Sequence, residues 1–238
     1  MGKSKDLATG ETRFVNTAGD TMTGDLTISS TAGQLKLTDT DGTEQNTTIK
    51  QSGGNLFIQS RDNTNNAGVV FAGNGGGNYS EHMRINASGQ VTMPSQPAFA
   101  GKSHSAWHTA TQGNTIVVDF VANSILYNTG NHFNVSNNRF VAPIAGKYLF
   151  HTQSYVKLDT SDDDGNHGYI WIKKNGSGYL ESYEIFGYMN SGDADQTVTV
   201  TTIMDMAVND YATLELTGAS GSTSYYGPAT NFSGYLLG

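Results

Sequence analysis

The chain has 238 residues, of which 36% are hydrophobic and 29 are glycine, and its formal net charge is −8. The acidic balance argues against a protein that binds nucleic-acid phosphates, and the lack of cysteine excludes disulfides and thiolate metal sites. No apolar run approaches the roughly 20 residues that a membrane span needs, so we expect no membrane insertion. A chain of this composition can bury one modest core, and we expect the remainder to draw stability from partner chains.

Residues 1–17 show no clear periodicity and are predicted to form an N-terminal linker. The first residues include Lys3 and Lys5, but the apolar run of a secretory signal peptide does not follow them. We therefore expect a protein that is used without signal-peptide export or that leaves the cell by another route.

A glycine-flanked turn leads into a threonine-rich, alternating strand at residues 18–28. This segment resembles the motif that opens shaft segments in phage tail fibres. Residues 81–93 resemble another segment that is common in the distal part of such fibres. The resemblance implies a virion protein that is assembled in the host cytoplasm and contacts other tail proteins.

Short strand candidates at 35–38, 55–59 and 68–72 are separated by glycine-rich turns, and no stretch has a useful helical period. A lone ribbon of a few short strands is only marginally stable in water. Winding three copies together would close the strand edges and bury the apolar face. Residues 18–93 are therefore predicted to form a β-rich, trimeric fibre shaft.

Pro94 and Pro97 hold the chain extended, so residues 94–97 are predicted to be a linker between the shaft and a head at 98–238. About eight to ten strands and no helix predict an all-β head that is a jelly-roll sandwich. The strand candidates are 98–99, 115–120, 133–135, 139–141, 146–158, 168–174, 179–189, 197–208, 211–217 and 231–237.

Aromatic residues recur at regular spacing in the middle of the head. Tyr148 and Phe150 fall on one face of a strand, because strand side chains alternate with period two. Gly146 permits a backbone geometry that a residue with a side chain would resist. Phe133 and Phe140 can cover the same core from neighbouring strands. These five residues are predicted to form a core motif.

The spacing of this core motif resembles the signature of the globular head of complement component 1q, a jelly roll similar to tumour necrosis factor. Asn128 fits the family pattern, whereas Ala122 stands where the family has Phe and Phe120 lies nearby. Residues 172–176, 209–214 and 232–237 also resemble family strands and turns. The resemblance covers residues 98–238 and implies a homotrimeric head.

The densest acidic run of the chain contains Asp162, Asp163 and Asp164. Adjacent carboxylates repel, so their loop either stays solvated or holds a cation. The run fails the EF-hand template, because the twelfth position counted from Thr160 would be Trp171 instead of Glu. A solvated loop and a Ca²⁺ site with Asp162 and Asp164 as ligands both remain open; the family resemblance adds weight to Ca²⁺. No other cofactor is expected.

Tyr225 and Tyr226 lie in a segment rich in glycine and serine that is interpreted as a surface loop, where exposed rings can contact a partner. The alternative is that one ring covers the sandwich. Trp107 and His108 are predicted to pack in the core or between subunits, and Trp171 can face either side of its strand.

If the strands from Gly146 onward alternate in direction, the loops 159–167, 188–196 and 218–230 lie at one end of the head. The resemblance to the complement 1q head implies that both termini lie at the base, so these loops would form the tip away from the shaft. Carboxylates and aromatic faces at such a tip are suited to sugar rings and hydroxyls, and they could equally bind a host protein. The candidate receptor-binding residues are Asp162, Asp163, Asp164, Tyr188, Asp193, Asp195, Tyr225 and Tyr226.

The sequence thus favours the distal part of a phage tail fibre that binds a host receptor. A glycan is the expected receptor, and no enzymatic activity is expected. The alternative is a structural module that trimerises a virion fibre while recognition lies elsewhere. A glycan-cleaving tailspike is disfavoured, because the sequence has no recognisable catalytic motif and the shaft is too short and glycine-rich for a long groove with paired carboxylates.

Overall fold

The computed structural model describes residues 34–38, 46–61, 67–75, 78–104, 106–158, 167–185 and 194–238. They divide into two units, one that runs up to Val70 and includes Arg84–Val91, and one that comprises Phe71–Met83 and Thr92–Gly238. The described residues form strands and connections, apart from one short 3₁₀ helix, η1 (Ala122–Ser124). The predicted all-β class is therefore confirmed. Within these residues no helix is long and apolar enough to cross a membrane.

Two small sheets precede the head along the chain, and the strands of the first pair antiparallel. The first contains β1 (Gln34–Thr38), β2 (Asn46–Ser52) and β3 (Asn55–Arg61), and the second contains β4 (Val69–Gly75), β5 (Asn78–Ile85) and β6 (Val91–Thr92). The turn between β2 and β3 consists of Gly53 and Gly54, which both have positive φ, at 55° and 80°. Two such residues form the tight hairpin turn that matches the twist of the flanking strands.

These small sheets bury no apolar core. Every large hydrophobic side chain described in the first sheet is exposed, and Leu56 on β3 is 69% exposed. All buried hydrophobic residues in the described part of the chain belong to the segment from Phe99 onward. The expectation that a single chain buries one modest core is therefore confirmed.

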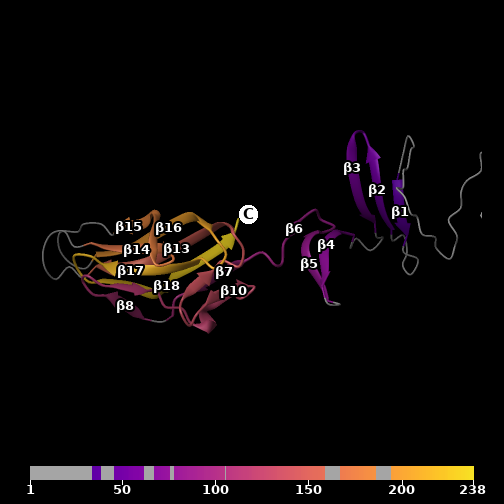
Figure 1. The fold of residues 1–238 in the computed structure, drawn as a ribbon. Coiled ribbons are helices and arrows are strands. Elements are labelled where there is room, and N and C mark those ends of the chain that lie inside the picture. Colours follow the sequence, from indigo (N-terminus) through magenta and orange to yellow (C-terminus); the bar gives the residue numbers. More distant parts are fainter. Residues whose placement is uncertain are drawn as a thin grey trace, which may run out of the picture. The chain divides into compact units, whose positions relative to one another are not determined.

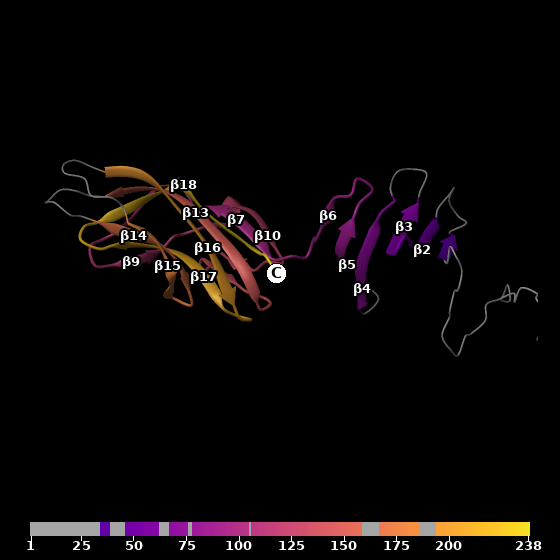
Figure 2. The same cartoon turned by 90° about the horizontal axis from the view of Figure 1, so that it is seen from above.

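The head is a sandwich of two sheets, and wherever strand registers are described its neighbouring strands run antiparallel (Figures 1 and 2). The β13 sheet has the order β10 (Ile125–Thr129), β7 (Ala98–Lys102), β18 (Thr223–Leu236), β13 (Gly146–Leu158) and β16 (Ala194–Met206), and β8 (Trp107–Ala110) pairs with β18. The β14 sheet has the order β11 (Phe133–Asn134), β12 (Arg139–Val141), β17 (Tyr211–Gly218), β14 (Gly168–Lys174) and β15 (Ser177–Ile185), and β9 (Thr115–Val117) pairs with β17.

The predicted core motif lies at the centre of this sandwich. Phe133, Phe140, Tyr148 and Phe150 are all buried, and the Tyr148 hydroxyl donates a hydrogen bond to the carbonyl oxygen of Ile144 at 2.9 Å. The Phe140 ring lies 5.5 Å from that of Tyr148 and 5.6 Å from that of Phe150. Buried aromatic rings at such separations contribute both apolar burial and ring–ring contact energy. The core prediction is confirmed for the four aromatic residues.

Gly146 is needed for a different reason from the predicted one. A Cβ at this position would lie 2.8 Å from Cδ1 of Leu236 and 3.1 Å from the carbonyl oxygen of Gly238. Gly146 is not among the residues with positive φ. The close approach of the C-terminal strand end, and not an unusual backbone conformation, therefore favours glycine at this position.

The segment predicted as a linker is hydrogen-bonded to the head. Pro97 is buried, and its carbonyl oxygen accepts a hydrogen bond from the backbone amide of Leu236 at 3.0 Å. The Gln96 side chain donates to the carbonyl oxygen of Leu236 at 2.5 Å. These contacts extend the pairing of β7 and β18 toward the N-terminus by residues 96 and 97.

The strand β18 changes partner half-way along its 14 residues. Its C-terminal half pairs with β7, and its N-terminal half, from Thr223 to Tyr226, pairs with β8. The register with β13 shifts between the two halves. At this shift the amide of Gly227 donates to the carbonyl oxygen of Ala106 at 3.0 Å, and a Cβ on Gly227 would overlap the carbonyl oxygen of His104. A glycine at residue 227 thus lets the connection after β7 cross β18.

Candidate functional site

The three connections predicted to form a tip begin and end at the same end of the sandwich. Leu158 at the end of β13 is paired with Ala194 and with Thr223, and Gly168 is paired with Gly218. The C-terminus lies at the opposite end (Figure 1). The predicted site residues Asp162, Asp163, Asp164, Tyr188 and Asp193 lie outside the described residues.

The structure places Tyr225 and Tyr226 in a strand, which corrects the prediction of a loop. Both residues belong to β18, where Tyr225 is paired with His108 and Tyr226 with Trp107. Tyr225 is fully buried, and its hydroxyl oxygen accepts a hydrogen bond from the backbone amide of Asp119 at 3.0 Å. The prediction that Tyr225 is an exposed contact residue is therefore wrong, because strand alternation turns its side chain inward.

Tyr226 joins Trp107 and Tyr155 in what we call the aromatic cluster, on the outward face of the β13 sheet. The centroid of the Trp107 ring lies 5.2 Å from that of Tyr226 and 5.7 Å from that of Tyr155. Strand pairing positions the three rings, because Tyr226 is paired with Tyr155 on one side and with Trp107 on the other. Trp107 is 43% exposed, so the cluster is open to solvent.

Asp195, the other predicted site residue that the structure describes, borders the aromatic cluster. The Tyr155 hydroxyl donates a hydrogen bond to Oδ2 of Asp195 at 3.1 Å, and this bond raises the pKa of Tyr155. The Asp195 side chain is exposed at the start of β16. The structure thus brings two of the predicted residues, Tyr226 and Asp195, to one surface through Tyr155.

This arrangement can bind but offers no acid–base pair. Aromatic faces stack on the apolar faces of sugar rings, while a carboxylate and a phenol hydroxyl accept and donate hydrogen bonds to hydroxyl groups. Among the described residues, Asp195 is the carboxylate that contacts the cluster, whereas glycoside hydrolysis uses two flanking carboxylates. Within the described residues, no group of three or more His, Cys, Asp or Glu side chains could hold a metal ion.

The sequence interpretation missed Trp107 and Tyr155 as surface residues. Trp107 was expected in the core or between subunits, yet its ring faces outward in this chain. Strand alternation could have placed Tyr155: Tyr148, Phe150 and Val156 face the core, so Tyr155 has to face outward. Trp107 could not be placed in this way, since β8 is defined only by its pairing with β18.

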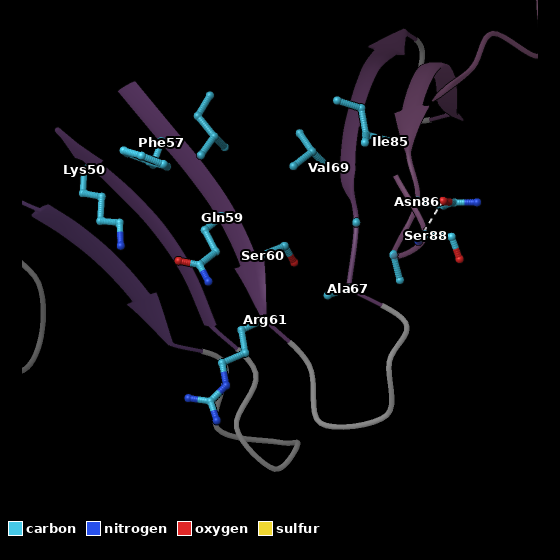
Figure 3. Close-up of a pocket in the computed structure, with 13 residues that line it drawn as sticks. Lys50, Phe57, Gln59, Ser60, Arg61, Ala67, Val69, Ile85, Asn86 and Ser88 are labelled. Atoms are coloured by element: carbon cyan, nitrogen blue, oxygen red, sulfur yellow. Dashed lines mark hydrogen bonds between the residues drawn. The ribbon is translucent and has the colours of Figure 1, made fainter. Parts of the chain in front are cut away.

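Two cavities elsewhere lack the residues for chemistry. One of about 830 Å³ is lined by residues of β2, β3, β4 and β5, among them Lys50, Phe57, Val69 and Ile85, and its described lining contains no carboxylate (Figure 3). Another of about 600 Å³ lies at the base of the head and is lined mainly by apolar groups. Its lining consists of Met93, Pro94, Gln96, Ala98, Tyr127, Thr129, Tyr235, Leu236 and Leu237.

The two antiparallel sheets and their connections make the head a jelly-roll sandwich. The chain belongs to the C1q domain family, since a model of the C1q domain matches residues 98–237, more than half of its length. C1q domains are non-enzymatic recognition or structural modules that typically form trimers and bind ligands. The chain is also similar to the solved structure of the globular domain of zebrafish complement 1qA protein, with 16% identity, coverage of 60% of this chain and 98% of that one, and a TM-score of 0.41.

Proposed function

We propose that the protein is the distal part of a phage tail fibre, located on the virion, whose trimeric C1q-type head binds a glycan on the host surface. The fibre assignment is supported by the resemblance of residues 18–28 and 81–93 to fibre segments. A C1q domain follows these segments directly along the chain. Other tail proteins would be partners at the far end of the fibre, and no chemistry is required of the head.

A trimer is supported by the apolar surface that a single chain leaves uncovered. The three-stranded sheet of β1, β2 and β3 exposes Leu37, Leu56 and Ile58, although an isolated sheet of this size is stable only when one face is covered. At the base of the head, Tyr127, Tyr235 and Leu237 are exposed around the apolar cavity there. Partner copies would cover both surfaces.

The observation that carries the binding proposal is the aromatic cluster beside Asp195. Strand pairing holds the rings of Tyr226 and Tyr155 at 5.2 Å and 5.7 Å from the Trp107 ring, so the surface is preorganised. Threefold symmetry would repeat the cluster, and three weak sugar contacts would gain strongly through avidity. We also propose that Asp162 and Asp164 contribute to receptor binding, either as Ca²⁺ ligands or as solvated carboxylates. Loss of cell binding on removal of Ca²⁺ by EDTA would favour the first alternative over the second.

The test is a double substitution, Trp107→Ala with Tyr226→Ala, in the full chain. Binding to host cells is expected to fall by about tenfold or more, which corresponds to about 1.4 kcal/mol of lost binding energy. The oligomeric state and the melting temperature are measured on the same samples. Leu126→Ala serves as the control, because Leu126 is an exposed apolar residue outside the cluster. Undiminished cell binding by the double variant, with the trimer intact, would refute the proposed site.

The exposed apolar surface at the head base also favours a second function, a structural module that holds three fibre chains in register. In that case the aromatic cluster would pack against a neighbouring subunit. Loss of the trimer in the double variant, together with failure of the parent head to bind host cells, would support this alternative. Sedimentation and cell binding therefore separate the two functions.

A further inference from the structure

The inner side of the aromatic cluster carries a half-buried histidine. His108 follows Trp107 on β8 and therefore points to the opposite face of the strand. Its ring stacks on Tyr225, with the ring centroids 4.9 Å apart and an interplanar angle of 14°. Nε2 of His108 is buried and has no hydrogen-bond partner in the described part of the chain.

Three titratable groups surround His108, each from a different segment. His104, from the connection between β7 and β8, lies with its ring centroid 5.0 Å from that of His108. Asp119, from the segment after β9, has Oδ2 2.6 Å from Nε2 of His104 and accepts a hydrogen bond on Oδ1 from Asn138 at 3.0 Å. Tyr225, from β18, offers its ring face. The carboxylate of Asp119 is thus already occupied by His104 and Asn138.

This environment suits a neutral His108 and disfavours its cation. A protonated imidazole would carry a buried N–H group without an acceptor, next to a second histidine. Burial and the charge of His104 lower the pKa of His108, and Asp119 opposes them only in part. In the unfolded chain the side chain titrates near its ordinary pKa of about 6.5. The stabilising contribution is therefore complete above about pH 6.5 and is lost as the pH falls toward the lowered pKa of the folded state.

The strand β8 is the element that would open first when His108 is protonated. It has four residues and pairs with β18 alone, whereas β18 is held independently by its long pairing with β13. Breaking the pairing of β8 would leave the other strands of both sheets paired. Short, singly paired elements open at a small fraction of the global unfolding free energy.

We propose that the head contains an acid-sensitive latch, in which protonation of His108 detaches β8 from β18 and withdraws Trp107 from the aromatic cluster while both sheets stay folded. Trp107 and His108 are adjacent on β8, so the inward-facing and outward-facing side chains move together. The latch is a property of this fold and does not depend on which ligand, if any, the aromatic cluster binds.

The test uses the full chain with Trp171→Phe, which leaves Trp107 as the single tryptophan, since the sequence has two. Fluorescence and amide hydrogen exchange are followed between pH 7.5 and 5. The Trp107 emission is expected to shift to longer wavelength. After correction for intrinsic exchange, the protection of the β8 amides is expected to fall about tenfold for each pH unit over which folding holds His108 neutral. Protection in β13 and β17 should stay within about twofold over the same range.

A further substitution, His108→Phe, keeps the ring that stacks on Tyr225 and removes the titratable group, so it is expected to abolish both pH responses. His132→Phe is the matched control, because burial lowers the pKa of His132 as well, but its ring packs near Phe140 and away from β8. The control should keep the response. An unchanged Trp107 signal in the parent, or an equal response in His108→Phe, would overturn the latch. If His108→Phe does not fold, NMR titration of His108 in the parent decides, since its midpoint has to coincide with the Trp107 transition.

Discussion

Replacing Phe99 by alanine is expected to be the most damaging single truncation in the head. Phe99 is 0% exposed, and its ring lies 4.6 Å from that of Phe133, 5.2 Å from that of Phe140 and 5.0 Å from that of Phe232. The ring therefore joins strands of both sheets. Phe→Ala substitutions in cores cost about 3–5 kcal/mol, and lost ring–ring contacts place this one in the upper half of that range.

The assay is thermal and urea denaturation of the head at a fixed protein concentration, because the stability of an oligomer depends on concentration. A loss of about 4 kcal/mol corresponds to a fall in melting temperature of roughly 8–16 °C for a domain of this size. Leu126→Ala is the control, since Leu126 is 69% exposed and its truncation should stay within about 0.5 kcal/mol. A loss below about 1 kcal/mol for Phe99→Ala would show that Phe99 does not join the two sheets.

Three further predictions concern other parts of the chain. Gly227→Ala should cost about 1–3 kcal/mol in urea denaturation, because the new Cβ overlaps the His104 carbonyl oxygen and that backbone has to shift; an unchanged midpoint would contradict the crossing at Gly227. Asp210→Ala should cost roughly 1.5–3 kcal/mol at pH 7, since Asp210 pairs with Lys174 at 2.9 Å and binds Asn175. These bonds lower the pKa of Asp210 to about 2, so the difference between parent and variant should vanish as the pH falls from 4 to 2. A fragment of residues 94–238 should fold and melt at a higher temperature than one of residues 98–238, which lacks the bonds from residues 96 and 97 to Leu236, while residues 18–93 alone should show no cooperative transition by circular dichroism.

The core could be predicted from the sequence because its signal is local. The alternation of Tyr148 and Phe150, and the spacing from Phe133 to Phe140, specify both the inward face of a strand and the family. The exposed apolar residues of the small sheets were likewise foreseen from short strands and low apolar content.

The candidate site could not be predicted in the same way, because strand partners distant in sequence create it. Tyr225 and Tyr226 are followed by Gly227 and Pro228, a combination that indicates a loop. Pairing with β8 converts this segment into a strand and sends the two rings to opposite faces. A residue pattern typical of turns can therefore mark the point where a strand changes partner. The residues beside such a pattern have to be considered both as a loop and as a strand.

The attachment of residue 97 to the C-terminal strand has a mechanical consequence. Tension from the preceding chain would enter the head along the axis of β7, which is paired with β18 from Ala98 to Lys102 and with β10 on its other edge. Hydrogen bonds in antiparallel sheets lie perpendicular to the strands, so this pull would load both ladders in shear, with all bonds sharing the force. Strand β8 comes after β7 along the chain, so Trp107 would bear tension only after β7 had been pulled out of the sheet. A head built in this way can be held under load at its base without disturbing the surface that carries the aromatic cluster.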